Sequence, residues 1–229
     1  MLEHTEYPPR QSTSSSSSTV FIESGASFFP RGLEKFSCPT VGYMIDVHAD
    51  FKVRENYAWF FDHIFVCHKD YIARFEARGF ANLHWMPVAC DPSLHGQLAV
   101  ERIYDVGFVG NYAANRERQR LLAALEQRFK LNDYRKYYPK EQLTEIYSRS
   151  KIVVNHCINK DVTMRVFEAL AAGALLVSSP MENAIGELLT AGEHYIEYRD
   201  ERSLIDQIEY FLSRDSERES HYGDEMVSV

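Results

Sequence analysis

Thr163-Met164-Arg165-Val166-Phe167-Glu168-Ala169-Leu170-Ala171-Ala172-Gly173-Ala174-Leu175-Leu176-Val177 is the stretch that decides the fold. The spacing of its apolar residues up to Ala172 predicts a helix, and Gly173 permits the left-handed turn that ends a helix without a steric cost from a Cβ atom. The apolar run from Ala174 to Val177 does not alternate with polar residues, as is typical of a strand buried in a parallel sheet. The stretch therefore predicts a helix, a tight corner and a buried strand.

Two charged side chains mark one edge of this predicted helix. Arg165 and Glu168 are three residues apart, so they share a face near the beginning of the helix. An arginine near a helix start suits a phosphate group, and a glutamate beside it can accept hydrogen bonds from a sugar diol. An ordinary α/β unit with a surface ion pair would show the same residues, so both interpretations stay open at this point.

Short apolar runs and helical stretches alternate along the chain from Val20 onwards, which is the pattern of βαβ units. Pro87 begins an irregular connection through His95, the candidate linker between two domains. We expect strands at residues 20–22, 41–45, 64–67, 83–86, 106–109, 152–155, 174–177 and 195–198. We expect helices at residues 55–61, 70–78, 121–129 and 141–148, and one that Asp200 caps.

Composition excludes several classes of protein. The net charge of −8 over 229 residues argues against a nucleic-acid surface, which needs a basic stripe. The four cysteines are far apart and form no Cys-x-x-Cys pair, which favours reduced thiols. There is no apolar run long enough for a transmembrane helix and no signal-peptide core, so we expect a cytoplasmic protein. No Asp-x-Asp motif and no zinc-like spacing of His and Cys occurs, and we expect no metal site and no cofactor.

The opening stretch resembles the donor-binding block of retaining glycosyltransferases of the two-Rossmann-domain (GT-B) architecture. It is most similar to the family-4-like branch that includes the spore-maturation glycosyltransferases. The pattern Asp-x-x-Met-Arg-x-Phe-Glu-Ala-Leu-Ala-x-Gly-Ala of that branch stands here from Asp161 to Ala174. Further similar segments, which extend the resemblance over about residues 20 to 214, are residues 39–48, 87–92, 104–111, 146–155, 192–194 and 198–200.

This resemblance implies an α/β fold with two Rossmann-like domains of GT-B type, the first of them incomplete. The chain resembles a member shortened at both ends, because the opening βαβ units of the first domain and the returning C-terminal helices of the family are not recognisable. The expected parts are a disordered Ser-rich tail (1–18), the C-terminal part of the acceptor-side domain (19–98), the donor-binding domain (103–214) and a second tail (215–229).

The resemblance also implies a donor-binding site. Glu168 would hold the ribose hydroxyls of a nucleotide, and Arg165 would neutralise its diphosphate. The turn at Gly110 and Asn111 follows a strand and precedes a helix, so its N–H groups can face an anion. We expect the loop of Asn183, Ala184 and Ile185, which opens the helix that carries Glu187, to cradle the donor phosphates.

Some positions depart from the family pattern or allow two interpretations. Many relatives carry a first Glu eight residues before the second, and here that position is Lys160. An exposed loop lysine is slightly favoured there over a phosphate or sugar ligand. Arg116 and Arg118 could reach phosphate, although a solvated helix face is at least as good an interpretation. For His156, a structural use is favoured over contact with the nucleotide base.

Asp46 and His48 end a predicted strand in the first domain, where open α/β sheets place their ligands. The resemblance implies a histidine that faces the donor from this domain. We therefore expect His48 to be the catalytic residue, with Asp46 as its orienting partner or as a base. A histidine and an aspartate that only shape a loop are the alternative.

The leading hypothesis is a metal-independent glycosyltransferase that moves a sugar from a nucleotide-diphosphate sugar to an unknown acceptor, which is a glycan, a protein or a small molecule. The first alternative is a catalytically inactive nucleotide-sugar-binding or interaction module, because of the missing segments and Lys160. An NAD-dependent oxidoreductase is the third, because the Gly110 turn is Rossmann-like.

Overall fold

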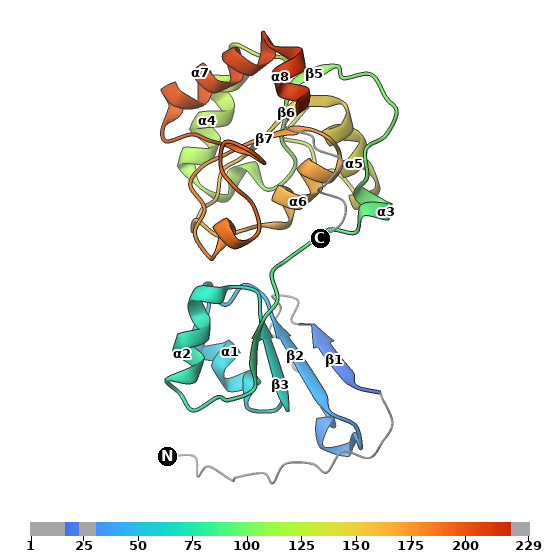
Figure 1. Cartoon of the computed structure of the whole chain (residues 1–229), viewed down its shortest axis with the longest axis vertical. Coiled ribbons are helices and arrows are strands. Elements are labelled where there is room, and N and C mark those ends of the chain that lie inside the picture. Colours follow the sequence, from blue (N-terminus) through green and yellow to red (C-terminus); the bar gives the residue numbers. More distant parts are fainter. Residues whose placement is uncertain (1–16, 23–30, 221–229) are drawn as a thin grey trace. The chain divides into compact units, whose positions relative to one another are not determined.

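The computed structural model describes residues 17–22 and 31–220. Most of the expected N-terminal tail, residues 1–16, and residues 221–229 lie outside this part of the chain. The protein divides into two compact units, which meet in the sequence between Pro87 and Val88. Figure 1 shows the helices and strands of the two units.

The N-terminal unit is built on a four-stranded sheet in the order β1-β2-β3-β4, in which all neighbours are parallel. Helices α1 and α2 lie on the same side of this sheet (Figure 1) and cover a core that includes Met44, Val66 and Phe75. The strands are β1 (Thr19–Ile22), β2 (Thr40–Met44), β3 (His63–Val66) and β4 (Leu83–Trp85). The helices are η1 (Leu33–Lys35), α1 (Phe51–Ala58), η2 (Lys69–Tyr71) and α2 (Ile72–Glu76).

The C-terminal unit has a second parallel sheet of four strands in the order β5-β6-β7-β8. Its strands are β5 (Tyr104–Gly107), β6 (Ser150–Asn155), β7 (Leu175–Ser178) and β8 (Ile196–Glu197). Its helices are α3 (Pro92–His95), η3 (Tyr112–Ala114), α4 (Arg116–Glu126), α5 (Lys140–Ser148), α6 (Met164–Ala171), η4 (Ile185–Glu187), α7 (Glu201–Leu212) and α8 (Asp215–Ser220).

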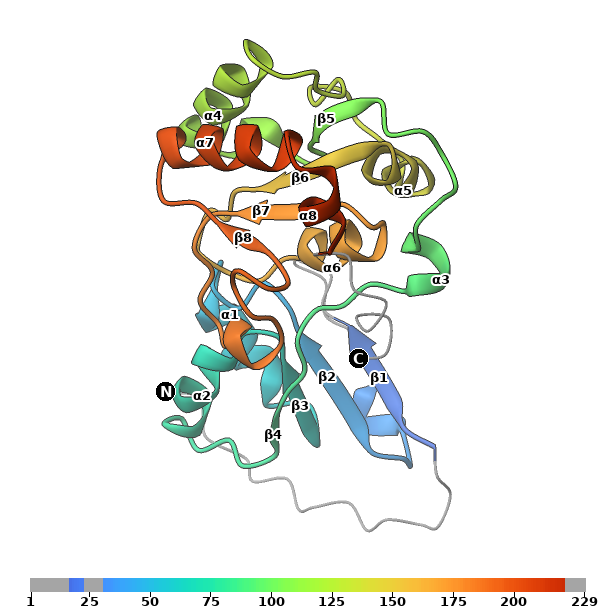
Figure 2. The same ribbon diagram turned by 45° about the horizontal axis from the view of Figure 1, so that its top comes forward.

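Helices cover both faces of this second sheet (Figure 2). On one face, Leu121 of α4 and Leu204 of α7 pack against strand residues such as Val154. On the other, Tyr147 of α5 and Val166 of α6 belong to a separate core cluster. Successive residues of a strand point to opposite faces, so the uninterrupted apolar run of β7 serves both cores. This three-layer arrangement confirms the predicted α/β fold with Rossmann-like units.

The connection after Val88 is fastened to the C-terminal unit. Its α3 helix begins with the Asp91 cap, whose Oδ1 accepts the N–H of Ser93 at 2.9 Å. Further hydrogen bonds join Thr144 Oγ1 to the Leu94 carbonyl (2.9 Å), the Leu98 N–H to Ser148 Oγ (3.1 Å), and the Arg102 guanidinium to the carbonyls of Ser150 and Gly173. These bonds explain why the compact units divide at residue 87, whereas the expected first domain ran to residue 98.

Element boundaries differ from the expectations in identifiable ways. Helix α1 begins at Phe51 and not at residue 55, because Asp50 caps it by accepting the N–H of Val53 at 3.2 Å. Strand β5 ends at Gly107, where its pairing with β6 ends, and the expected strand ran on to residue 109. In the stretch expected to be a C-terminal tail, residues 215–220 form helix α8, and Arg218 donates to the Phe211 carbonyl at 2.9 Å.

Within residues 17–22 and 31–220, no helix combines the length and the apolar character that crossing a bilayer requires.

Close approach of β5 and β6 at Gly107 generates a stability prediction. A Cβ atom on Gly107 would overlap the hydroxyl of the buried Ser150 and stand 2.8 Å from its Cβ. We expect Gly107→Ala to lower the free energy of unfolding by about 1–3 kcal/mol in urea denaturation, as overpacking does. The control is Gly186→Ala, since no atom lies within 4 Å of the added methyl group at that position. Equal stabilities of the two variants would contradict this packing.

Candidate functional site

The candidate site lies where the strands of the C-terminal unit end. The carboxyl ends of parallel strands are where open α/β sheets place their ligands. β5 leads into Gly110, β6 ends at Asn155, and β7 ends at Ser178. Helix α6, which follows β6, supplies Arg165 and Glu168 from its first turns. The sequence-predicted pair thus lies on one element at this edge of the sheet.

Arg165 is held in place by neutral acceptors. Its Nε and Nη2 atoms donate to the carbonyl of Val109 at 3.1 and 3.0 Å, and its Nη1 donates to Asn155 Oδ1 at 2.8 Å. Tyr147, which is fully buried, also donates its hydroxyl to the Val109 carbonyl at 3.4 Å, and burial raises the pKa of this phenol to about 12. The guanidinium is therefore fixed, although no carboxylate of residues 17–22 or 31–220 holds it.

Gly110 makes room for this guanidinium. Its φ of +142° lies in the region that favours glycine, and a Cβ atom here would overlap Arg165 Nη2. Asn111, the other predicted residue of this turn, caps η3 by accepting the N–H of Ala113 at 3.1 Å. The turn therefore shapes the site through its backbone.

Arg118, for which the sequence left a phosphate contact and a solvated helix face open, is buried close to Arg165. It is only 7% exposed and donates to the carbonyls of Asn111 (2.8 Å) and His156 (2.6 Å), while its Nε is buried without a hydrogen-bond partner. A signal for its burial was present in the sequence, because Arg118 lies three and four residues before Leu121 and Leu122 on the apolar face of α4. Arg116 is exposed, as a solvated helix face would be.

The two arginines share one aromatic ring. The Arg165 and Arg118 Cζ atoms lie 4.6 and 5.7 Å from the centre of the Phe108 ring, within the range of cation–π attraction. Burial, and then the charge of Arg165, lower the pKa of the Arg118 guanidinium. Among the described residues, no carboxylate lies within ion-pair distance of either arginine. The cluster of Arg118, Arg165 and Phe108 therefore carries positive charge that no ion pair in this part of the chain neutralises, and the carboxylates of Asp161 and Glu168 act on it only at longer range.

Glu168 is the complementary group of the site. It is 8% exposed, and in the described part of the chain no hydrogen bond or ion pair holds its carboxylate. Burial raises the pKa of Glu168, and the charges of His95, Arg165 and Lys140 offset only part of this effect. Its carboxylate oxygens are not among the described polar atoms that are buried without a partner, so they reach solvent, and a ligand with hydroxyl groups can donate hydrogen bonds to them.

The expected phosphate-binding loop has a different conformation from the prediction. Asn183 and Ala184 both adopt left-handed backbone angles, with φ of 58° and 59°, and only the single 3-10 turn η4 follows. A helix does begin at Ile185 and contains Glu187, but it is only the three-residue 3-10 helix η4, and its N-cap Ala184 is left-handed. Ile185 is buried in the core, and Glu187 is exposed.

Two further residues occupy structural positions. Lys160, which replaces the first Glu of the family pattern, forms an exposed ion pair with Glu182 at 2.6 Å between Nζ and Oε1. His156 is buried, and its Nδ1 lies 2.9 Å from the hydroxyl of Tyr198. Burial lowers the pKa of His156, and the positive charges of Arg118 and Arg165 lower it further.

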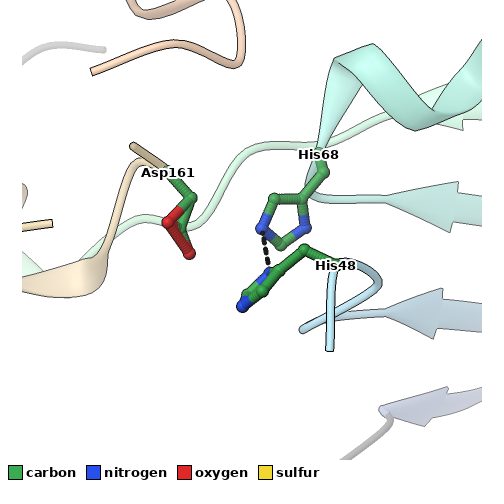
Figure 3. A group of neighbouring side chains, drawn as sticks. All are labelled: His48, His68 and Asp161. Atoms are coloured by element: carbon green, nitrogen blue, oxygen red, sulfur yellow. Dashed lines mark hydrogen bonds between the residues drawn. The ribbon is translucent and has the colours of Figure 1, made fainter. Parts of the chain in front are cut away.

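In the N-terminal unit, His48 is paired with a histidine that the sequence analysis did not single out. Its Nδ1 lies 3.0 Å from Nε2 of the buried His68, and the two rings are edge to face (Figure 3). The other ring nitrogen of His68 lies 2.8 Å from the Cys67 thiol. Asp46, with φ of 51°, is exposed and accepts the N–H of Ala49 through its backbone carbonyl. The ends of β2 and β3 thus bring together a Cys67–His68–His48 chain.

Electrostatics at Glu168 generate a pH prediction. The folded-state pKa is raised, so the folded protein loses stability as the pH rises from below the ordinary glutamate pKa through the raised value. We expect Glu168→Gln to unfold at a higher urea concentration than the parent at pH 7, and at nearly the same concentration at pH 4, where Glu168 is protonated. The exposed Glu141→Gln on helix α5 is the control. A Glu168→Gln variant that is less stable than the parent at pH 7 would refute the electrostatic argument.

Comparisons with known proteins bear on the fold and the family of the chain. A search of curated protein sequences found no match. Among solved structures, sucrose-phosphate synthase from Thermosynechococcus elongatus is similar over 85% of this chain and 64% of its own, at 12% identity and a TM-score of 0.59. HepE from Anabaena, in complex with UDP and glucose, is similar over 82% of this chain and 66% of its own, at 13% identity and a TM-score of 0.61.

A third similar structure is TarM, at 10% identity and a TM-score of 0.56, over 83% of this chain and 46% of TarM. The chain thus spans about half to two thirds of the length of these proteins, and the likeness shows that it shares the GT-B fold.

Residues 98–226 match the model of a protein family described as glycosyl transferase-like. This range includes Arg118, Arg165 and Glu168. Since the match extends over more than half of the sequence, the chain belongs to the glycosyl transferase-like family.

Proposed function

We propose that the C-terminal unit binds the nucleoside diphosphate part of a sugar donor, and that the protein transfers the sugar to an acceptor without a metal ion. The observation that carries this proposal is that one unit contains, among its described residues, both a carboxylate without a hydrogen-bond donor and two arginines without an ion pair. Glu168 is a largely buried residue whose carboxylate accepts no hydrogen bond from the described residues. Arg118 is buried and Arg165 half-buried, and neither forms an ion pair within that part of the chain.

Glu168 would hold the ribose. A carboxylate can accept hydrogen bonds from both hydroxyls of a diol, and each such bond to a charged group is stronger than a neutral one. Nicotinamide dinucleotides also contain ribose, but the family match favours a sugar donor over the oxidoreductase alternative. The bound HepE complex contains UDP, which makes UDP the first nucleotide to test.

The diphosphate would lie against Arg165 and Arg118. A guanidinium presents N–H groups in a fork that fits phosphate oxygens, and three of the five on Arg165 already point to protein acceptors, which sets the direction of the others. The backbone at Gly110 and the loop of Asn183, Ala184 and Ile185 would complete the phosphate site. Both loops have left-handed residues, which allow close approach of the backbone to a ligand.

The same positive charge would serve the reaction. When the bond between the sugar and the diphosphate breaks, negative charge develops on the departing diphosphate. Fixed guanidinium groups stabilise this charge without having to reorganise. Two arginines supply the electrostatic role that a divalent cation has in other sugar transferases, which is the basis for the proposed metal independence.

His48 would act in the chemical step, with Asp46 as a supporting residue. A histidine can transfer protons near neutral pH, and the hydrogen bond with His68 gives the ring of His48 a defined orientation (Figure 3). The second substrate of the proposed reaction is the acceptor, which is a glycan, a protein or a small molecule.

The first test is nucleotide affinity. We expect UDP, or the best of UDP, GDP and ADP, to bind the parent protein, and Arg165→Ala to weaken that binding about tenfold or more. The reason is that a hydrogen bond to a charged group contributes about 1.5–3 kcal/mol. Arg116→Ala, which removes the same charge from an exposed position, is the matched control. Calorimetry that detects no nucleotide binding by the parent would end the proposal.

Metal independence has its own test. We expect the nucleotide dissociation constant measured in EDTA to be within about twofold of that measured with millimolar Mg²⁺, because the Arg118–Arg165 cluster supplies the positive charge. A loss of binding in EDTA that Mg²⁺ restores would show that the diphosphate needs a cation.

Measurements of turnover distinguish the glycosyltransferase hypothesis from the inactive binding-module hypothesis. With a donor and an accepted substrate, we expect His48→Ala to lower kcat and leave donor affinity nearly unchanged, because His48 belongs to the N-terminal unit and the donor ligands to the other. Glu168→Gln should mainly raise the donor KM. Equal effects of both changes on donor affinity would contradict this division of roles. Donor binding without transfer or donor hydrolysis under any condition would instead favour the inactive binding module.

A further inference from the structure

Asn155 is the one side chain that joins Arg165 to the interior of the sheet in the part of the chain that the structure describes. It is the last residue of β6 and is 0% exposed. Its Oδ1 accepts the Nη1 hydrogen bond of Arg165 at 2.8 Å, and its Nδ2 lies 3.0 Å from Ser178 Oγ and 3.1 Å from Cys157 Sγ. Both ends of the amide are therefore engaged.

The partner of Asn155 on the interior side is itself fixed. Asn155 and Ser178 are register partners in the parallel β6–β7 ladder. The Ser178 hydroxyl in turn donates to the Ser179 carbonyl at 2.9 Å. Since a fully buried amide must satisfy its polar atoms within the protein, this chain of bonds leaves one orientation of the amide, with the oxygen toward Arg165.

The acceptor that Asn155 offers to Arg165 is uncharged, and this affects the charge of the cluster. A carboxylate would hold Arg165 equally well, but it would also cancel the positive charge. The asparagine oxygen and the Val109 carbonyl hold the guanidinium and leave its charge available. The same reasoning applies to Arg118, whose two acceptors are also backbone carbonyls.

We infer that Asn155 is a positioning residue for anion binding: it fixes the Arg165 guanidinium toward the diphosphate site without placing a negative charge beside it. This inference deepens the proposed function and rests on it for the identity of the anion. The positioning itself concerns only residues of this chain, and it can be measured without any ligand.

The ligand-free measurement is nuclear magnetic resonance of the arginine side chains. We expect separate, slowly exchanging Nη signals for Arg165 in the parent protein, assigned by their loss in Arg165→Lys, because the hydrogen bonds of Nη1 and Nη2 hinder rotation about the Cζ–Nη bonds. In Asn155→Ala the two proton signals of Nη1 should merge, whereas those of Nη2, which the Val109 carbonyl still holds, should stay separate. Rapidly rotating Arg165 Nη groups in the parent would overturn the inference, whether or not the protein binds nucleotides.

The charge argument is tested with inorganic pyrophosphate, UDP and uridine as probes. We expect Asn155→Asp to weaken binding of pyrophosphate and UDP about tenfold, since the new carboxylate compensates Arg165. Uridine, which has no phosphate, should bind the variant as it binds the parent. Ser178→Ala is the control, because it disturbs the same buried network without adding a charge.

Each outcome separates the possibilities. Equal weakening of uridine and UDP by Asn155→Asp, or equal effects of Asn155→Asp and Ser178→Ala, would show a merely structural role for Asn155. If Asn155→Asp does not fold, the parent spectrum still decides the positioning. If the parent binds none of the three probes, the proposed function fails while the resonances of Arg165 still test the geometry.

Discussion

The parallel pairing of β6 with β5 on one side and β7 on the other is the constraint on which the candidate site depends. This register places the end of β5, Asn155 and Ser178 at a common edge. The buried hydrogen bonds from Asn155 and the carbonyl of Val109 then fix a guanidinium that arrives from helix α6. The sheet edge thus supplies the hydrogen-bond acceptors of the candidate site, and helix α6 supplies its charged side chains.

The site carries an electrostatic cost in the ligand-free protein. Among the described residues, two guanidinium groups share the Phe108 ring without an ion pair, and burial disfavours the charged form of Glu168. Charged groups that are removed from water without an ion pair lower the stability of a fold. A bound anion with hydroxyl groups would offset this cost both at the two arginines and at Glu168. The arrangement therefore does not stabilise the fold by itself, which is consistent with the proposed donor site. The extensive apolar cores on both faces of the sheet offset its cost.

The sequence predicted the repeating α/β units, because apolar runs and a glycine corner encode local structure directly, as Gly173 does with its φ of 68°. It placed Arg165 and Glu168 on one helix for the same reason. It could not identify His68, since a histidine after a strand has no spacing that reveals its partner. Arg118 was within reach of prediction through the apolar face of α4, but its charge suggested solvent. The conformation around Ala184 was unpredictable, because nothing in an alanine signals a left-handed backbone.

The hydrogen bonds between residues 88–103 and the rest of the C-terminal unit determine where the chain can be cut to make a fragment. The family match begins at residue 98, and a fragment cut there would lose the Leu94 carbonyl that accepts from Thr144. A cut just before β5 would also remove the Arg102 bonds to Ser150 and Gly173, which tie the start of the sheet to the corner after α6. The compact C-terminal unit therefore begins about ten residues before the family match, near Val88, and a fragment that is meant to keep these bonds has to begin there.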